Sequence, residues 1–127
     1  MIIGIGVDLV EAKRIQKLLD EYGDKFAGRL VNSEERKYYE RSSRPMWFLA
    51  NRFAAKEALS KALGTGLRYP VTLHSIGVIS TDIGQPEFRY SEALKSYMES
   101  RNVTNAHLSI THEKGLVCAV VVLEARG

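Results

Sequence analysis

Apolar residues near the start of the chain change from a strand-like to a helix-like spacing. The β-branched run IIGIGVD predicts a strand over 2–8 that ends at Asp8. Gly4 and Gly6 have no side chain, so one face of this strand allows another backbone to approach closely. Over 11–22 the apolar residues recur at helical spacing, which predicts an amphipathic surface helix.

Two further helices are predicted before the middle of the chain. Asn32 can cap a helix that runs to about Arg41, and Glu35 completes the capping box. The stretch SSRP interrupts this helix, and the pattern over 45–63 predicts a longer one that ends at Gly64. Most positions of the longer helix hold Trp, Leu, Phe or Ala, so we expect it to be central and largely buried.

The second half of the chain has the short, bounded apolar runs that are typical of β-strands. Strands are expected over 71–80, 86–90, 105–112 and 115–124, with one helix over 91–101. One strand before the helices and several after them predict an α+β fold, with helices packed on a mainly antiparallel sheet. The length of 127 residues predicts a single domain over 1–127.

Composition and charge narrow the class of protein. Hydrophobic residues make up 45% and charged residues 26%, as in soluble domains rather than disordered or fibrous chains. The net charge of +3 mildly favours acidic partners such as phosphates, nucleic acid or an acidic protein surface. We expect no membrane span and no signal peptide. Cys118 is the one cysteine and lies in an apolar run, which excludes an intrachain disulfide and predicts a reducing, cytoplasmic location.

Glu57 and Lys61 stand one turn apart, among alanines, on the long predicted helix. The simplest interpretation is an i,i+4 ion pair on a solvated face, which contributes only ~0.2–0.5 kcal/mol. The alternative is a binding site, because the small neighbours let a ligand or another chain approach both charges. The same helix carries a separate polar stripe of Arg52, Lys56 and Ser60.

Asp8 is the lone charge at the end of the first predicted strand, where a carboxylate commonly caps a helix or supports a turn. Together with Glu57 it would also suit Mg²⁺, which takes one or two protein carboxylates and completes its octahedron with water and phosphate oxygens. His112, on a strand where Ser109 and Thr111 alternate with it, is either a phosphate ligand or a satisfied histidine at a turn.

Lys13, Arg14 and Lys17 gather in the first two turns of the helix predicted over 11–22, opposite its apolar stripe. Positive charge at a helix N-terminus opposes the macrodipole, by ~0.3–1 kcal/mol when exposed. These cations are therefore either simply solvated or used to dock an acidic helix.

Three segments occur together and in order: GIGVDLVE at 4–11, RFAAKEALSKALGTG at 52–66 and LSITHEKG at 108–115. In a chain this short they resemble the holo-[acyl-carrier-protein] synthases, the small homotrimeric family of 4′-phosphopantetheinyl transferases. The resemblance implies that family's fold and a homotrimer with sites at subunit interfaces. It implies Mg²⁺-dependent transfer of 4′-phosphopantetheine from coenzyme A to a serine of apo-acyl carrier protein, for fatty acid biosynthesis. Adenosine 3′,5′-bisphosphate would be released.

The family pattern also implies roles for single residues of this chain. Asp8 and Glu57 match the metal-binding carboxylates, and Lys61 would face the phosphates and stabilise or protonate the departing bisphosphate. Asp8, Glu57 and Lys61 are thus the expected catalytic residues, and the base stays open between Glu57, acting through a metal-bound water, and Asp8. Nucleotide and phosphate binding is expected at Arg52, Lys61, Ser109 and His112.

The resemblance supplies a partner for the cations of the first predicted helix, which in this family meets the acidic recognition helix of the carrier protein. Lys13, Arg14 and Lys17 would dock that helix, with Phe26 as an apolar anchor. Where the family usually has Gly-Lys-Pro, this chain has Gln85 in the middle, which leaves only a phosphate contact there open.

A different class of function also fits the residues: a non-catalytic basic module that binds an acidic protein or RNA and needs no divalent ion. RNA-binding domains usually combine a basic surface with exposed stacking aromatics, and none are interleaved with Lys13–Lys17. We therefore expect no nucleic acid beyond the nucleotide of coenzyme A. Relatives that modify peptide-synthetase carriers are a second alternative, but they are usually longer chains built from two fused halves.

Overall fold

The computed structural model describes residues 1–126. Its elements are β1 (Ile2–Glu11), α1 (Ala12–Tyr22), α2 (Asp24–Leu30), α3 (Ser33–Arg41), α4 (Pro45–Leu63), β2 (Ile76–Ser80), β3 (Pro86–Tyr90), α5 (Glu92–Ser100), β4 (Asn105–Glu113) and β5 (Leu116–Glu124). Within the described residues, none of the helices combines the length and the hydropathy that a membrane crossing requires.

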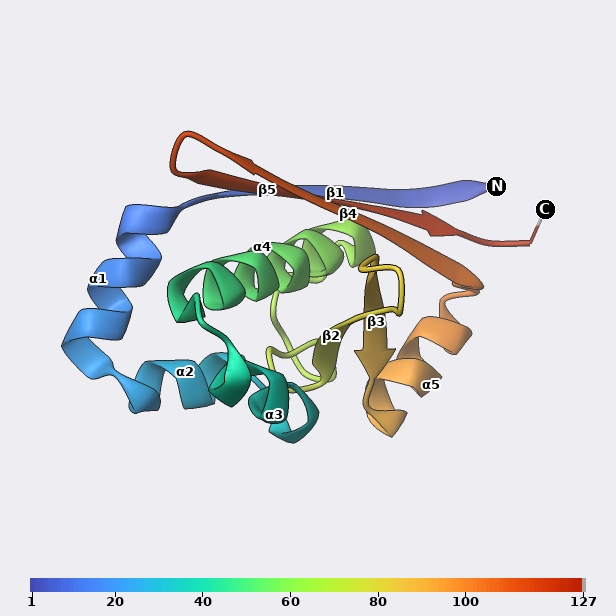
Figure 1. Cartoon of the computed structure of the whole chain (residues 1–127). Helices are drawn as coiled ribbons and strands as arrows, with labels where there is room; N and C mark the ends of the chain where they lie inside the picture. The colour runs from blue at the N-terminus through green and yellow to red at the C-terminus, as the bar shows by residue number, and fades with distance from the viewer. Residues whose placement is uncertain (127) are drawn as a thin grey trace.

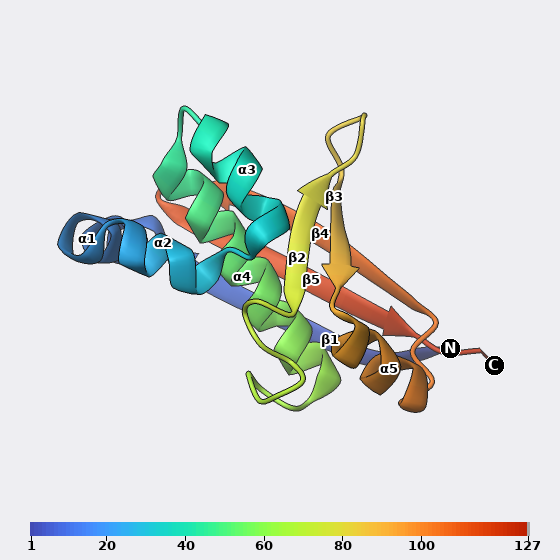
Figure 2. The ribbon, with the colours of Figure 1, turned by 90° about the horizontal axis from the view of Figure 1, so that it is seen from below.

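Helix α4 lies at the centre, beneath the larger of two sheets (Figure 1). The larger sheet has the strand order β1-β5-β4 and the smaller one pairs β2 with β3, and every pairing is antiparallel. From below, α4 runs along the larger sheet with α1 and α2 towards one end, α5 towards the other and β2 and β3 beside it (Figure 2). The expected α+β fold is confirmed, although its strands form two sheets rather than one.

Two elements differ from the sequence prediction. Helix α2 was not predicted, because its seven residues are too few for a clear helical period and include Gly28. The strand expected over 71–80 begins only at Ile76. Before it, the chain turns: the backbone amide of Thr72 donates to Ser75 Oγ at 2.8 Å, and the amide of Ser75 donates to Thr72 Oγ1 at 3.0 Å.

Strand β1 packs against α4 with backbone on backbone. A Cβ at Gly6 would lie 1.9 Å from the carbonyl oxygen of Ala58, and a Cβ at Gly4 would lie 2.3 Å from that of Ala62. No side chain fits at these positions unless the strand moves away from the helix. Asp8 follows two residues after Gly6, and therefore on the same face of the strand.

The opposite side of α4 is tied to its neighbours by a buried ion pair. Lys56 Nζ donates to Glu35 Oε1 at 2.6 Å, to the Leu30 carbonyl at 2.6 Å and to the Leu73 carbonyl at 2.8 Å. Glu35 Oε2 accepts from the amide of Val78 at 3.0 Å. Both charged side chains are fully buried, and they connect α2, α3, α4 and β2. The capping box predicted for Asn32 and Glu35 is confirmed as part of this network.

We expect Gly6→Ala to lower the free energy of unfolding by about 1–3 kcal/mol or more, because the added methyl meets backbone that cannot rotate away. Urea denaturation measures the change. Gly28→Ala is the matched control, because a Cβ there meets nothing nearer than 3.9 Å and alanine favours the helix. Equal stability of the two variants would contradict the backbone contact.

Candidate active site

Asp8 faces α4 from β1 and is bound by a lysine. Lys61 Nζ donates to Asp8 Oδ1 at 2.9 Å and to the backbone carbonyl of Val7 at 3.2 Å. The side chain of Asp8 is 13% exposed, whereas that of Lys61 is 53% exposed. In the sheet register Asp8 is paired with Ala119, which is paired in turn with Ile110 of β4. The lysine therefore bridges the helix and the strand.

Glu57 lies one turn before Lys61 on α4, close enough to Asp8 for the two carboxylates to repel. Burial raises the pKa of Glu57, and the charge of Asp8 raises it further. The charges of Lys61 and of Arg14 on α1 act in the opposite direction and lower it. We call the four side chains of Asp8, Arg14, Glu57 and Lys61 the charged site. It is assembled by β1, α1 and α4.

The simplest interpretation of Glu57 and Lys61, an ion pair along the helix, is not what the structure shows. Lys61 pairs with Asp8 across to the strand, and Glu57 forms no ion pair within residues 1–126. Glu57 is half-buried rather than on a solvated face. The two residues are thus separate members of a site.

The donor set of the charged site suits a hard, oxygen-seeking cation. Nowhere in residues 1–126 do three or more His, Cys, Asp or Glu side chains gather at metal-binding distance. A closed zinc cage is therefore absent from the described chain. Two carboxylates at one place match Mg²⁺, which keeps several waters and uses substrate phosphates as further ligands.

The two residues predicted from strand β4 point to opposite faces of the larger sheet. His112 lies on the same face of this strand as its inward-facing residues. The centre of its ring is 5.0 Å from that of Trp47, at the start of α4. Ser109 lies on the outer face, where it is paired with Val120. Within one chain, therefore, the structure does not bring Ser109 to Asp8, which faces α4.

Arg52 also lies away from the charged site, on the side of α4 that carries the buried ion pair. Its Nη2 donates to the Val78 carbonyl at 3.2 Å, and its Nε lies 3.9 Å from Glu35 Oε2. Its guanidinium lies 3.7 Å from the centre of the Phe48 ring, and burial lowers its pKa. A nucleotide-binding role for Arg52 stays a prediction.

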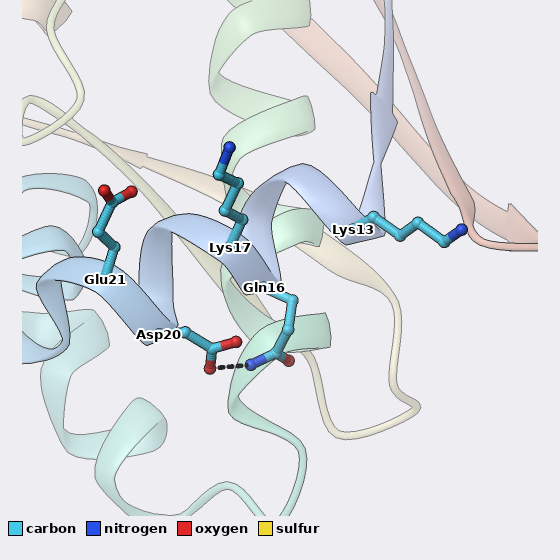
Figure 3. Close-up of a pocket in the computed structure, with 5 residues that line it drawn as sticks. All are labelled: Lys13, Gln16, Lys17, Asp20 and Glu21. Carbon is cyan, nitrogen blue, oxygen red and sulfur yellow. Dashed lines mark hydrogen bonds between the residues drawn. The ribbon is translucent and has the colours of Figure 1, made fainter.

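The predicted docking residues lie on α1 and α2. Lys13 and Lys17 line a shallow hollow of about 470 Å³ whose other lining residues, Gln16, Asp20 and Glu21, also belong to α1 (Figure 3). Because one helix supplies the whole lining, this hollow is an exposed helix face rather than a cleft. Asp20 accepts a hydrogen bond from Gln16 at 2.7 Å.

Phe26 lines a second hollow, of about 290 Å³, between α1 and α2. Its other lining residues are Leu18, Tyr22, Lys25 and Arg29. Sequence reasoning did not assign these four to docking, because it predicted the end of the first helix at Gly23 but not the short helix that follows. Apolar residues rimmed by two cations form a surface that suits an amphipathic acidic partner.

Gln85 lies in the turn between β2 and β3. It lines a hollow of about 240 Å³ together with residues of β4, among them His107. The structure thus places Gln85 on the side of the molecule away from α1. A phosphate contact by Gln85 stays open.

A family model described as the 4′-phosphopantetheinyl transferase superfamily matches residues 4–121. The chain belongs to this superfamily. A holo-[acyl-carrier-protein] synthase of Nitrosospira multiformis is 51% identical over 124 residues, which make up 98% of this chain and 99% of that protein. The family and the class of enzyme expected from the three motifs are confirmed.

Solved structures of transferases from this superfamily have the same fold. The holo-[acyl-carrier-protein] synthase of Neisseria meningitidis is 43% identical and has a TM-score of 0.95, with 98% of this chain and 99% of that chain covered. The synthase of Bacillus anthracis, solved in complex with CoA (3′,5′-ADP), is 41% identical with a TM-score of 0.82 and 99% coverage of both chains.

In this transferase we expect the carboxyl of Glu57 to titrate above 4.5, its ordinary value, because burial and Asp8 both disfavour the charged form. Asp8→Asn should lower the midpoint, since it removes a negative charge and frees Lys61 to attract Glu57 instead. Carboxyl-detected NMR across an acid titration measures both midpoints. Asp20→Asn, at an exposed position near the C-terminal end of α1, should leave the midpoint of Glu57 in place, since Asp20 does not contribute to its shift. If Asp8→Asn does not move the midpoint of Glu57, the two carboxylates do not interact and do not form one site.

Proposed function

We propose that this chain transfers the 4′-phosphopantetheine group of coenzyme A to a serine of an apo-acyl carrier protein, using Mg²⁺ and releasing adenosine 3′,5′-bisphosphate. The observation that carries the proposal is the convergence of Asp8 and Glu57, from β1 and α4, beside the cation of Lys61. The relatives named holo-[acyl-carrier-protein] synthase, one of them solved with CoA (3′,5′-ADP), support the same substrates.

Asp8 and Glu57 would hold the Mg²⁺. A metal held there would supply positive charge to a diphosphate whose anhydride bond breaks. The chain itself supplies a fixed pair of carboxylates, because backbone packing at Gly6 holds β1 on the helix that carries Glu57. Asp8 is largely shielded from water, which strengthens its interaction with any cation.

The transfer forms a bond between the serine oxygen and the β-phosphorus of coenzyme A and breaks the bond from that phosphorus to the bridging oxygen. The serine proton must be removed as this happens. Glu57 and Asp8 are the two carboxylates of the charged site that could take it, either directly or through a water. Lys61, half-exposed and one turn away, stabilises the negative charge that develops on the departing bisphosphate.

The carrier protein would dock on α1 and α2. Lys13 and Lys17 offer exposed positive charge, and Phe26 lies in an apolar hollow rimmed by Lys25 and Arg29. Arg14, on the same helix as Lys13 and Lys17, is near enough to Glu57 for its charge to lower the pKa of that carboxylate. A serine presented next to Arg14 would therefore arrive beside one of the two candidate bases.

The outer face of the larger sheet supports association between copies of the chain, which we propose to be a homotrimer with sites at subunit interfaces. On β1 this face carries exposed Ile3, Ile5, Val7 and Leu9, and β5 continues it with half-buried valines. A contiguous apolar surface of this kind is typical of a protein interface. Ser109 lies on the same face, so a neighbouring subunit is the route by which it would reach a nucleotide. A cytoplasmic location likewise remains a prediction.

A non-catalytic basic module is the second candidate. The basic residues on α1 and α2 favour binding of an acidic partner, but such binding needs no pair of converging carboxylates. The two proposals differ in whether a divalent ion is required.

Incubation of the protein with apo-carrier, coenzyme A and Mg²⁺ should add the mass of phosphopantetheine to the carrier serine, as seen by mass spectrometry. Glu57→Gln should slow this transfer roughly 100-fold or more while the fold is kept, because one of the two carboxylates proposed to hold the metal is lost. Glu99→Gln, the same change at an exposed position of α5, is the control. Undiminished transfer by Glu57→Gln would show that Glu57 is not part of the site. If the native chain transfers nothing, the non-catalytic binding module is the function that still fits.

Reversal of Lys13 and Lys17 to Glu should raise the KM for the carrier about tenfold and leave the KM for coenzyme A unchanged, because both side chains are exposed and outside the charged site. The effect should shrink as salt is added. Steady-state kinetics with each substrate varied measures the split. Equal changes in both constants would speak against docking on α1.

A further inference from the structure

Lys61 already occupies the carboxylate that a divalent cation would need. Its ammonium lies 2.9 Å from Asp8 Oδ1 and 3.2 Å from the Val7 carbonyl oxygen. These two neighbouring acceptors of β1 therefore face the same positive charge. A metal ion that approaches Asp8 meets a cation at hydrogen-bond distance from its ligand. The two cations therefore compete.

The charges of the charged site also cancel. Asp8 and Glu57 contribute two negative charges, and Lys61 and Arg14 contribute two positive ones. A neutral site has little net attraction for a divalent cation. A diphosphate brings the missing negative charge, and it also offers oxygens to which an ammonium group can move.

Lys61 is free to make that move. More than half of its side chain is exposed, and apart from the bond to the Val7 carbonyl its hydrogen-bond partner is Asp8 itself. Asp8, by contrast, is held by the strand and almost buried. The movable member of the pair is the lysine.

We propose that Lys61 acts as a stand-in cation at Asp8, which keeps divalent metal weakly bound until a diphosphate draws the lysine away. The metal and the diphosphate of the substrate then bind together rather than in sequence. The inference rests on the proposed function, since it concerns the same two carboxylates. Before the substrate arrives, Lys61 weakens metal binding at Asp8. Once Lys61 has moved to the diphosphate, it no longer opposes the metal.

Titration with Mn²⁺ alone, followed by the electron paramagnetic resonance signal of the free ion, tests the first half. Lys61→Met should tighten Mn²⁺ binding about tenfold, because an adjacent positive charge is removed. Lys95→Met, which removes the same charge from an exposed position of α5, should leave Mn²⁺ binding unchanged. Adding Asp8→Asn to Lys61→Met should abolish the gain.

The same titration with inorganic pyrophosphate tests the second half. Pyrophosphate should tighten Mn²⁺ binding by the native chain several-fold more than binding by Lys61→Met, because only the native chain has a lysine to release. Unchanged or weaker Mn²⁺ binding by Lys61→Met, or no binding by either protein, would overturn the inference. The proposed function is judged apart from this, by the mass of the carrier after incubation with coenzyme A and Mg²⁺, so each can fail alone.

Discussion

The backbone of β1 lies directly against the backbone of α4, and the charged site depends on that contact. At Gly6 the carbonyl of Ala58 leaves no room for even a methyl group. Because residues of a strand alternate between its two faces, the face that carries Gly4 and Gly6 also carries Asp8. The carboxylate is thus delivered to the helix where the two elements are closest, beside Glu57 and Lys61.

The other side of α4 is held by charge rather than by close packing. All three protons of the Lys56 ammonium have acceptors, and the Glu35 carboxylate accepts from Lys56 and from backbone amides. A buried pair that is satisfied in this way fixes geometry, because any shift leaves a charge without a partner. Lys56 and Glu57 are neighbours in sequence, so the constraint on one side of the helix orients the acid on the other.

Different parts of this arrangement were open to prediction to different degrees. The helix over 45–63, its ends and the capping box at Asn32 follow from local signals, and the structure has them at those positions. The convergence of Asp8 and Glu57 came from three motifs considered together, since neither acid alone distinguishes a site from a cap or a surface pair. The absence of side chains at Gly4 and Gly6 indicated that another backbone can approach closely, but the sequence did not identify α4 as the partner.

The features that the sequence did not predict depend on contacts with backbone atoms, which leave no signal in the sequence. The polar stripe of Arg52, Lys56 and Ser60 was recognised, but not that Lys56 and Ser60 would be fully buried. Two of the three acceptors of Lys56 are carbonyls, of Leu30 and Leu73, which any residue could supply. Helix α2 was missed for a related reason, since a short helix after a glycine turn has no period to recognise.

The contact between Trp47 and His112 gives the protein an intrinsic fluorescent reporter. The chain contains one tryptophan, and its indole lies 5.0 Å from an imidazole at the end of β4. Tryptophan emission from the native protein therefore comes from a single, known position. Events that change the charge or the place of that imidazole would alter the emission without any label being attached.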